Sequence, residues 1–64
     1  MHRFLNTVEE TANLLSLGRT AVYQLINSGQ LESVKIGGAR RVLHASIEAY
    51  VERLRQEAQG EEIR

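Results

Sequence analysis

Apolar side chains recur at helical spacing in two short segments of the first half of the chain. The first segment, residues 8–15, is preceded by Thr7 and begins with Val8-Glu9-Glu10. This is the pattern of a capping box, in which the Thr7 hydroxyl accepts from the Glu10 amide and the Glu10 carboxylate accepts from the Thr7 amide. The second segment, residues 19–27, groups three apolar side chains within one third of its circumference, namely Val22, Leu25 and Ile26. Because only about three residues join the segments, we expect a steep crossing, the geometry of a helix-turn-helix.

The pattern then changes to short runs rich in β-branched residues on either side of Gly37-Gly38, which predicts a β-hairpin. Two registers are open. A two-residue turn pairs Val34 with Arg41, whereas a three-residue loop pairs Val34 with Val42. The longer loop separates apolar from basic side chains better, although it can require a positive φ at Ala39. We favour the three-residue loop.

A third helical pattern covers residues 45–58. Its apolar side chains form one stripe about 100° wide, and we expect the stripe to pack into the core. The stripe consists of Ile47, Tyr50, Val51, Leu54 and Ala58. The order of elements predicts a mainly α fold with a small β-hairpin, a winged helix-turn-helix domain over residues 1–58. Residues 59–64 are expected to be a flexible C-terminal tail.

The composition argues against an enzyme and favours a small binding domain. The 64 residues include no Cys, and no Asp that could orient one of the two histidines. Glu9 and Glu10 point about 100° apart on a helix and do not form an acid/base pair. We therefore expect no catalytic residue, metal or cofactor. No apolar run approaches the ~20 residues of a membrane span, and the N-terminus lacks the apolar core of a signal peptide, so we expect a cytoplasmic protein.

Charge is balanced overall but unevenly distributed. Eight Lys and Arg residues stand against eight acidic residues. Residues 1–47 carry five basic and three acidic side chains, and residues 48–64 carry three basic and five acidic ones. Between Arg19 and Ser46 the only acidic residue is Glu32. Net neutrality argues against a strongly basic nucleic-acid binder, whereas the nearly acid-free stretch favours DNA as a partner.

Two surfaces in that stretch carry side chains suited to double-stranded DNA. The polar face of the second predicted helix offers groups for base edges and phosphates: Arg19, Thr20, Tyr23, Gln24 and Asn27. The hairpin adds three cations and a glycine turn that permits close approach to a phosphate backbone: Lys35, Gly37, Gly38, Arg40 and Arg41. Either surface alone is more often ordinary solvated surface, so it is their combination that favours DNA binding.

Over residues 5–54 the sequence resembles the excisionase family, a MerR-like winged-helix group. The resemblance is carried by Thr7-Val8-Glu9-Glu10-Thr11-Ala12, Arg19-Thr20-Ala21-Val22-Tyr23-Gln24, Val34-Lys35-Ile36-Gly37-Gly38 and Ile47-Glu48-Ala49-Tyr50-Val51. It implies a second helix in the major groove, a wing on the backbone or the neighbouring minor groove, and no catalysis. Two positions depart from the family pattern: Gly18 replaces the usual Ser cap, and Ala39 replaces a basic wing-tip residue.

The resemblance further implies a DNA-bending protein that binds repeated sites of an attachment region and sets the direction of phage or mobile-element recombination with an integrase. A chain ending at residue 64 ends too soon for the coiled coil and effector domain of full MerR-type regulators. We therefore expect a monomer in free solution, with neighbouring protomers side by side on DNA in the bacterial host cytoplasm. Its acidic third helix and tail would suit contacts with integrase or the next protomer.

Two alternatives remain open. One is a small stand-alone transcriptional regulator of the same fold. The other is a protein-interaction module, such as an adaptor or antitoxin-like domain, which the net neutrality of the chain favours.

Overall fold

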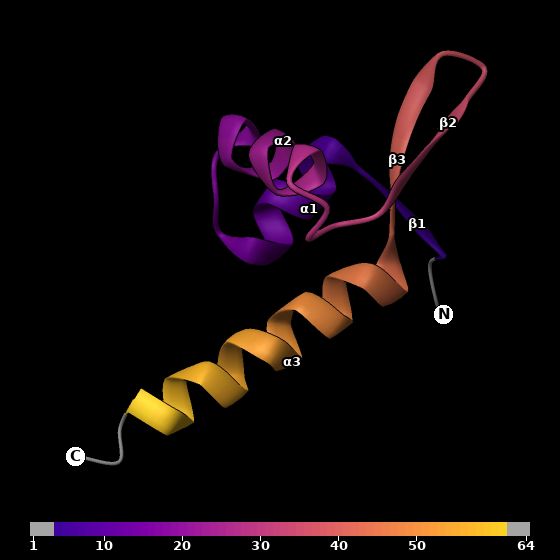
Figure 1. Ribbon diagram of the computed structural model, residues 1–64. Coiled ribbons are helices and arrows are strands. Elements are labelled where there is room, and N and C mark those ends of the chain that lie inside the picture. The colour runs from indigo at the N-terminus through magenta and orange to yellow at the C-terminus, as the bar shows by residue number, and fades with distance from the viewer. Residues whose placement is uncertain (1–3, 62–64) are drawn as a thin grey trace.

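The computed structural model of the chain describes residues 4–61 and confirms the winged helix-turn-helix (Figure 1). In chain order its elements are β1 (Leu5–Thr7), α1 (Val8–Leu15), α2 (Arg19–Asn27), β2 (Ser33–Ile36), β3 (Ala39–Leu43) and α3 (His44–Glu61). α1 and α2 have the predicted bounds, whereas α3 continues past its predicted end at residue 58. Residues 62–64 of the expected tail lie outside the described part of the chain.

The helix-turn-helix begins with the predicted capping box. The Thr7 Oγ1 accepts a hydrogen bond from the Glu10 amide, and the Glu10 Oε1 accepts one from the Thr7 amide, both at 2.9 Å. α1 ends at Ser16, whose φ of 58° turns the chain back. α2 then starts after Gly18, which caps the helix without a side-chain hydrogen bond. Local signals therefore determine both ends of the turn between the helices.

The sheet has a third strand that the sequence did not predict. Its order is β1-β3-β2 and both pairings are antiparallel, so β3 is the central strand. In β1, Leu5 pairs with Leu43 and Asn6 with Val42. Three residues are too few to display the alternation of apolar and polar side chains from which a strand is recognised.

The hairpin uses the two-residue turn, so the register that we favoured is wrong. Val34 pairs with Arg41. Gly37 and Gly38 have φ values of 56° and 91°, and two successive left-handed residues are what a tight hairpin turn of this kind requires. Glycine adopts these angles without the steric cost that the longer loop can impose on Ala39. The backbone angles that the tight turn requires thus determine the register more strongly than the pairing of apolar with apolar and basic with basic side chains across the hairpin.

One small core joins the helices to the sheet. Its buried apolar side chains are Val8, Ala12, Val22, Leu31, Val42 and Ile47. Leu15, Leu25, Ile26 and Tyr50 pack against this cluster and are partly buried. Thr11 is fully buried, and its hydroxyl donates to the Thr7 carbonyl at 2.9 Å. The buried hydroxyl therefore keeps a hydrogen-bond partner.

The apolar stripe of α3 enters the core only at the N-terminal end of the helix. Ile47 is buried and Tyr50 is half-buried, but Val51 and Leu54 remain 44% and 43% exposed. The expectation that the whole stripe is core is therefore wrong. The physical reason is visible in Figure 1, where α3 projects away from the rest of the molecule, so its later turns are covered less than its first turn. Within residues 4–61, no helix combines the length and apolarity needed to cross a bilayer.

Polar contacts hold the start of α3 against the body. The Ser46 hydroxyl accepts from the Glu32 amide at 2.8 Å. One turn beyond the core, the Arg53 guanidinium donates to the Gln30 side chain at 3.2 Å and lies 5.7 Å from the centre of the Tyr50 ring. These contacts fix the direction in which α3 leaves the domain.

Candidate nucleic-acid interface

The predicted recognition residues all lie exposed on α2. Val22 is completely buried, and Leu25 and Ile26 pack beside it against the core, so this side of the helix faces the body of the protein. The exposed residues are Arg19, Thr20, Tyr23, Gln24 and Asn27. α2 contains no acidic residue, so its outer face presents hydrogen-bonding groups and one cation without a competing carboxylate of its own. Such a face can enter a major groove.

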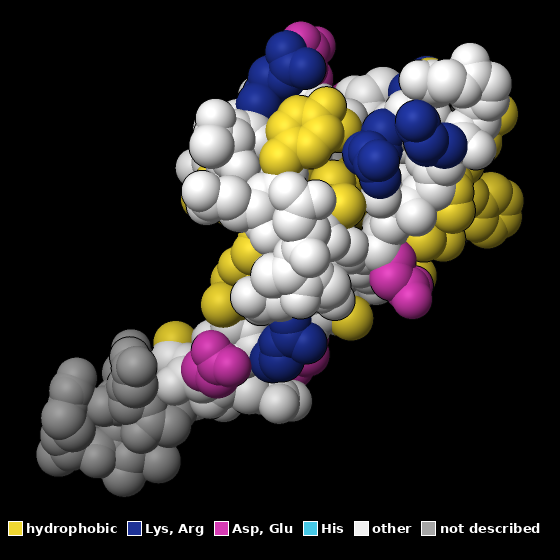
Figure 2. All heavy atoms as spheres, turned by 45° about the horizontal axis from the view of Figure 1, so that its top comes forward, with side chains coloured by type: hydrophobic (Ala, Val, Ile, Leu, Met, Phe, Trp, Pro, Cys, Tyr) yellow, Lys and Arg dark blue, Asp and Glu magenta, His cyan; other side chains and the backbone are white. Residues whose placement is uncertain are grey.

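Two elements of the predicted interface meet at one concavity of about 260 Å³. α2 and β3 supply four of the predicted DNA-binding residues to its lining: Arg19, Tyr23, Arg40 and Arg41. The first residues of α1 and its cap complete the lining: Thr7, Val8 and Glu9. In Figure 2, Lys and Arg side chains stand on either side of a hydrophobic patch on this face. Three cations around one hollow form a surface that attracts phosphate.

The two arginines of the wing lie on β3, in the part that lines the concavity beside α2 and that we call the base of the wing, and both are held in place. The Arg40 Nη1 donates to the Ser33 hydroxyl at 2.7 Å across the hairpin. The Arg41 Nη1 donates to the Arg40 carbonyl at 3.1 Å. Both arginines are half-buried. Because their conformations are already restricted, they lose less entropy when they bind a partner.

The remaining wing residues do not line this concavity. Lys35 lies opposite Arg40 in the β2–β3 ladder, and Gly37 and Gly38 form the exposed tip. The structure therefore divides the predicted wing site into the two arginines, which line the concavity beside α2, and Lys35 with the two tip glycines, which do not.

A second and larger groove, of about 570 Å³, separates the end of α2 from the hairpin. Asn27 lines it from the helix, and Ser33 and Arg40 line it from the strands. Arg40 thus borders both hollows, whereas Thr20 and Gln24 stand on the open surface of α2. Arg40 therefore connects the two hollows, one of which is lined by Arg19 and Tyr23 and the other by Asn27.

The start of α1 is the part of this interface that sequence reasoning missed. Thr7, Val8 and Glu9 reach the concavity because Thr7 pairs with Arg41 in the β1–β3 ladder. The capping box indicates where α1 starts, but only the unpredicted strand β1 places that start beside the wing. The free amides of a first helical turn also carry partial positive charge.

Among the side chains that the structure describes, those of residues 4–59, no group of three or more His, Asp or Glu is arranged to hold a metal ion. The geometry that stands out is the basic face formed by α2, the base of the wing and the cap of α1.

Known proteins are similar to this chain in sequence. Residues 7–55 match the helix-turn-helix domain family. The chain is 51% identical over 53 residues to a probable excisionase of Saccharopolyspora erythraea, a match that covers 83% of this chain and 54% of that protein. It is 42% identical over 48 residues to an excisionase of Streptomyces ambofaciens, covering 75% and 77% respectively. The chain thus spans about half the length of the first relative and three quarters of the second. It belongs to the excisionase family of helix-turn-helix proteins.

Proposed function

We propose that this chain binds and bends double-stranded DNA in the attachment region of a phage or mobile element and directs a separate integrase towards excision. The observation that carries the proposal is the convergence of Arg19, Arg40 and Arg41 on one concavity beside the exposed, acid-free face of α2. Membership of the excisionase family supports the role in recombination.

The two parts of the basic face suit different tasks. On α2, Gln24 and Asn27 have the bidentate geometry that reads adenine, and Arg19 has the geometry that reads guanine. At the base of the wing, Arg40 and Arg41 suit phosphates, which position a protein on the duplex without reading its sequence. If both parts of the face contact phosphates, on either side of the DNA groove that α2 enters, these contacts would hold the DNA in a bent form.

Under this proposal the chain changes the shape of DNA, and the integrase breaks and joins the strands. Bending brings distant integrase-bound arms together, so a protein without an active site decides the direction of the reaction. A protein with this role acts on DNA in the cytoplasm of its bacterial host.

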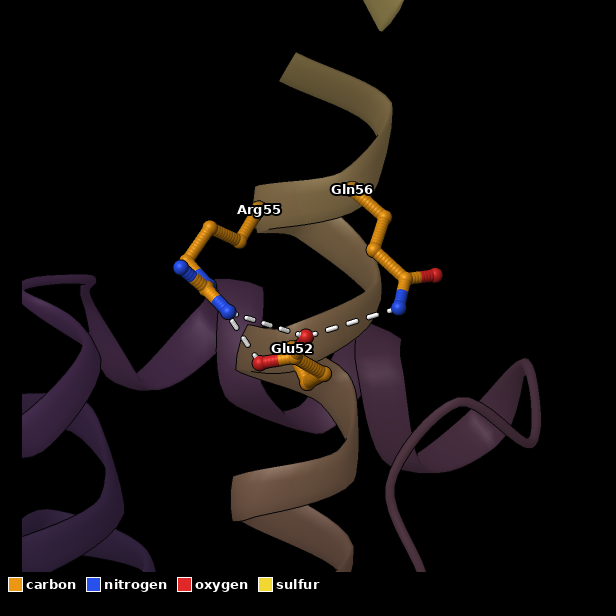
Figure 3. A network of polar contacts seen from close by, with 3 residues as sticks. All are labelled: Glu52, Arg55 and Gln56. Carbon is orange, nitrogen blue, oxygen red and sulfur yellow. Dashed lines mark hydrogen bonds and ion pairs between the residues drawn. The ribbon is translucent and has the colours of Figure 1, made fainter. Parts of the chain in front are cut away.

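We place the partner surface on the projecting part of α3. Val51 and Leu54 are exposed there, beside a polar network in which the Glu52 carboxylate accepts from Arg55 at 3.2 and 3.3 Å and from Gln56 at 3.4 Å (Figure 3). The Arg55 hydrogen bond and charge lower the pKa of the Glu52 carboxyl. We call Val51 and Leu54 the exposed strip of α3. An apolar strip with charged side chains beside it is suited to contact an integrase or a neighbouring protomer.

The strip is small, and this supports a monomer in free solution. A stable protein–protein interface buries about 1,200–2,000 Å² in total, far more than two half-exposed aliphatic side chains supply. Neighbouring protomers would therefore meet only where adjacent DNA sites bring them together and raise their effective concentration.

A recombination assay tests the proposal. A plasmid with the two junctions of the integrated element is incubated with the cognate integrase, with and without this chain. We expect excision only when the chain is present. Excision at the same rate in its absence would contradict the proposed role, and altered transcription from a neighbouring promoter would then favour the regulator.

A further inference from the structure

Glu9 is the one acidic side chain among the residues that line the cationic concavity. The capping box explains its position. The adjacent Glu10 turns its carboxylate back to the Thr7 amide, whereas Glu9, the preceding residue on the helix, lies on the side that faces α2. Glu9 and Arg19 also border a further hollow, of about 260 Å³, beside the turn between α1 and α2.

The Glu9 carboxylate and the Arg19 guanidinium form an open ion pair. The Glu9 Oε2 lies 3.9 Å from the Arg19 Nη1, and the side chains are 74% and 61% exposed. An exposed pair of this kind adds little to the free energy of unfolding. Arg19 can therefore exchange the carboxylate for another anion while the fold stays intact.

From this geometry we infer that Glu9 is a specificity-determining residue, which competes with DNA phosphates for Arg19 and so weakens binding to unrelated sequences. The inference rests on the proposed DNA binding. The inference gives Glu9 a role in DNA recognition, although its ionised carboxylate has no hydrogen-bond donor to offer to DNA.

The effect on specificity follows from the contacts that stabilise specific and non-specific complexes with DNA. Non-specific complexes depend almost entirely on phosphate contacts, whereas a specific complex adds contacts to base edges. A guanidinium has five N–H donors, so Arg19 can bond a guanine edge with two of them and keep Glu9 as a further partner. If Arg19 binds a phosphate instead, the phosphate and the carboxylate repel each other. Glu9 therefore penalises the non-specific complex more.

The test compares Glu9→Gln with Glu57→Gln, which removes the same charge from the exposed far part of α3. Affinity is measured by fluorescence anisotropy for two short duplexes, one of unrelated sequence and one that the wild-type chain selects from a randomised pool. We expect Glu9→Gln to tighten binding of the unrelated duplex by about two- to fivefold, and to tighten the selected duplex less. Glu57→Gln should leave the ratio of the two affinities unchanged.

A double-mutant cycle separates the ion pair from general charge effects. In an Arg19→Ala background, Glu9→Gln should no longer change the preference between the two duplexes. Equal tightening of both duplexes, or a change that persists without Arg19, would overturn the role of Glu9 and leave DNA binding standing. Failure of the wild-type chain to bind either duplex at low salt would overturn the proposed function together with the inference.

Discussion

Thr7 lies opposite Arg41 in the ladder between β1 and β3, so the residue that caps α1 is fixed beside a cation of the wing. The same short strand is linked to α3, because the Oδ1 of buried Asn6 lies 2.8 Å from the Nδ1 of His44. Three residues of β1 therefore bring the start of α1, the base of the wing and the start of α3 together. This pairing places Thr7 and the first residues of α1 in the lining of the basic concavity.

The Ser33–Arg40 hydrogen bond gives a prediction that distinguishes the positioning of the Arg40 side chain from the effect of its charge. Ser33→Ala removes the acceptor of the Arg40 guanidinium and leaves the number of cations unchanged. We expect DNA affinity to fall about two- to tenfold, because Arg40 must then be immobilised when DNA binds, at about 0.5–1.5 kcal/mol for such a side chain. The slope of affinity against salt should stay the same, since the protein still neutralises the same phosphates. Anisotropy titrations at several salt concentrations measure both quantities, and an unchanged affinity would contradict the positioning role of Ser33.

Gly18 gives a prediction about stability. It is the N-cap of α2 and has a φ of −80°, and a Cβ added there would meet no atom within 4 Å. Gly18→Ser should therefore raise the free energy of unfolding by a few tenths of a kcal/mol, because the serine hydroxyl can accept from a free amide of the first turn. Thermal unfolding followed by circular dichroism should show a higher Tm.

Gly38→Ser is the matched control for this substitution. Its φ of 91° is unfavourable for a residue with a Cβ, although the space around it is equally open. We expect a lower Tm. If both substitutions shift the Tm in the same direction, the capping explanation for Gly18 is wrong.

The exposed strip on α3 gives a prediction about partners. Val51→Ser combined with Leu54→Ser should leave the fold and single-site DNA binding intact, because both side chains are more than two fifths exposed. Cooperative loading on adjacent sites, or excision with integrase, should be reduced. Ile47→Ala, on the buried side of the same helix, should instead destabilise the chain by about 2–5 kcal/mol. Unchanged cooperativity and excision in the double variant would remove α3 from the partner surface.

The sequence predicts those parts of the fold whose signals are local. The capping box at Thr7 and the glycine stop after Asn27 lie within a few residues of the helix ends that they specify, and both helices have the expected bounds. The glycine pair likewise marks the hairpin. Its register differs from the expectation because the φ requirements of the turn outweigh the sorting of apolar from basic side chains.

Features that depend on distant residues could not be predicted. Periodicity identifies the apolar side of α3, but it does not show that the body of the protein ends before Val51 and Leu54. The recognition residues of α2 are exposed as expected, because Val22, Leu25 and Ile26 lie within one third of the circumference of that helix and pack into the core. Glu9 looks like an ordinary first-turn acid, and its place beside Arg19 is defined only by tertiary structure.

The salt dependence of DNA binding tests the central claim most directly. Wild-type chain, an Arg40→Ala and Arg41→Ala double variant, and an Arg55→Ala control are titrated onto attachment-site DNA over a range of salt concentrations. We expect wild-type affinity to fall steeply with salt, and the log–log slope of the double variant to be shallower by about 0.9 for each phosphate that it no longer neutralises. Arg55 lies on α3 and pairs with Glu52, so the control should keep the wild-type slope. Absence of binding at low salt, or one slope for all three proteins, would contradict the proposed interface.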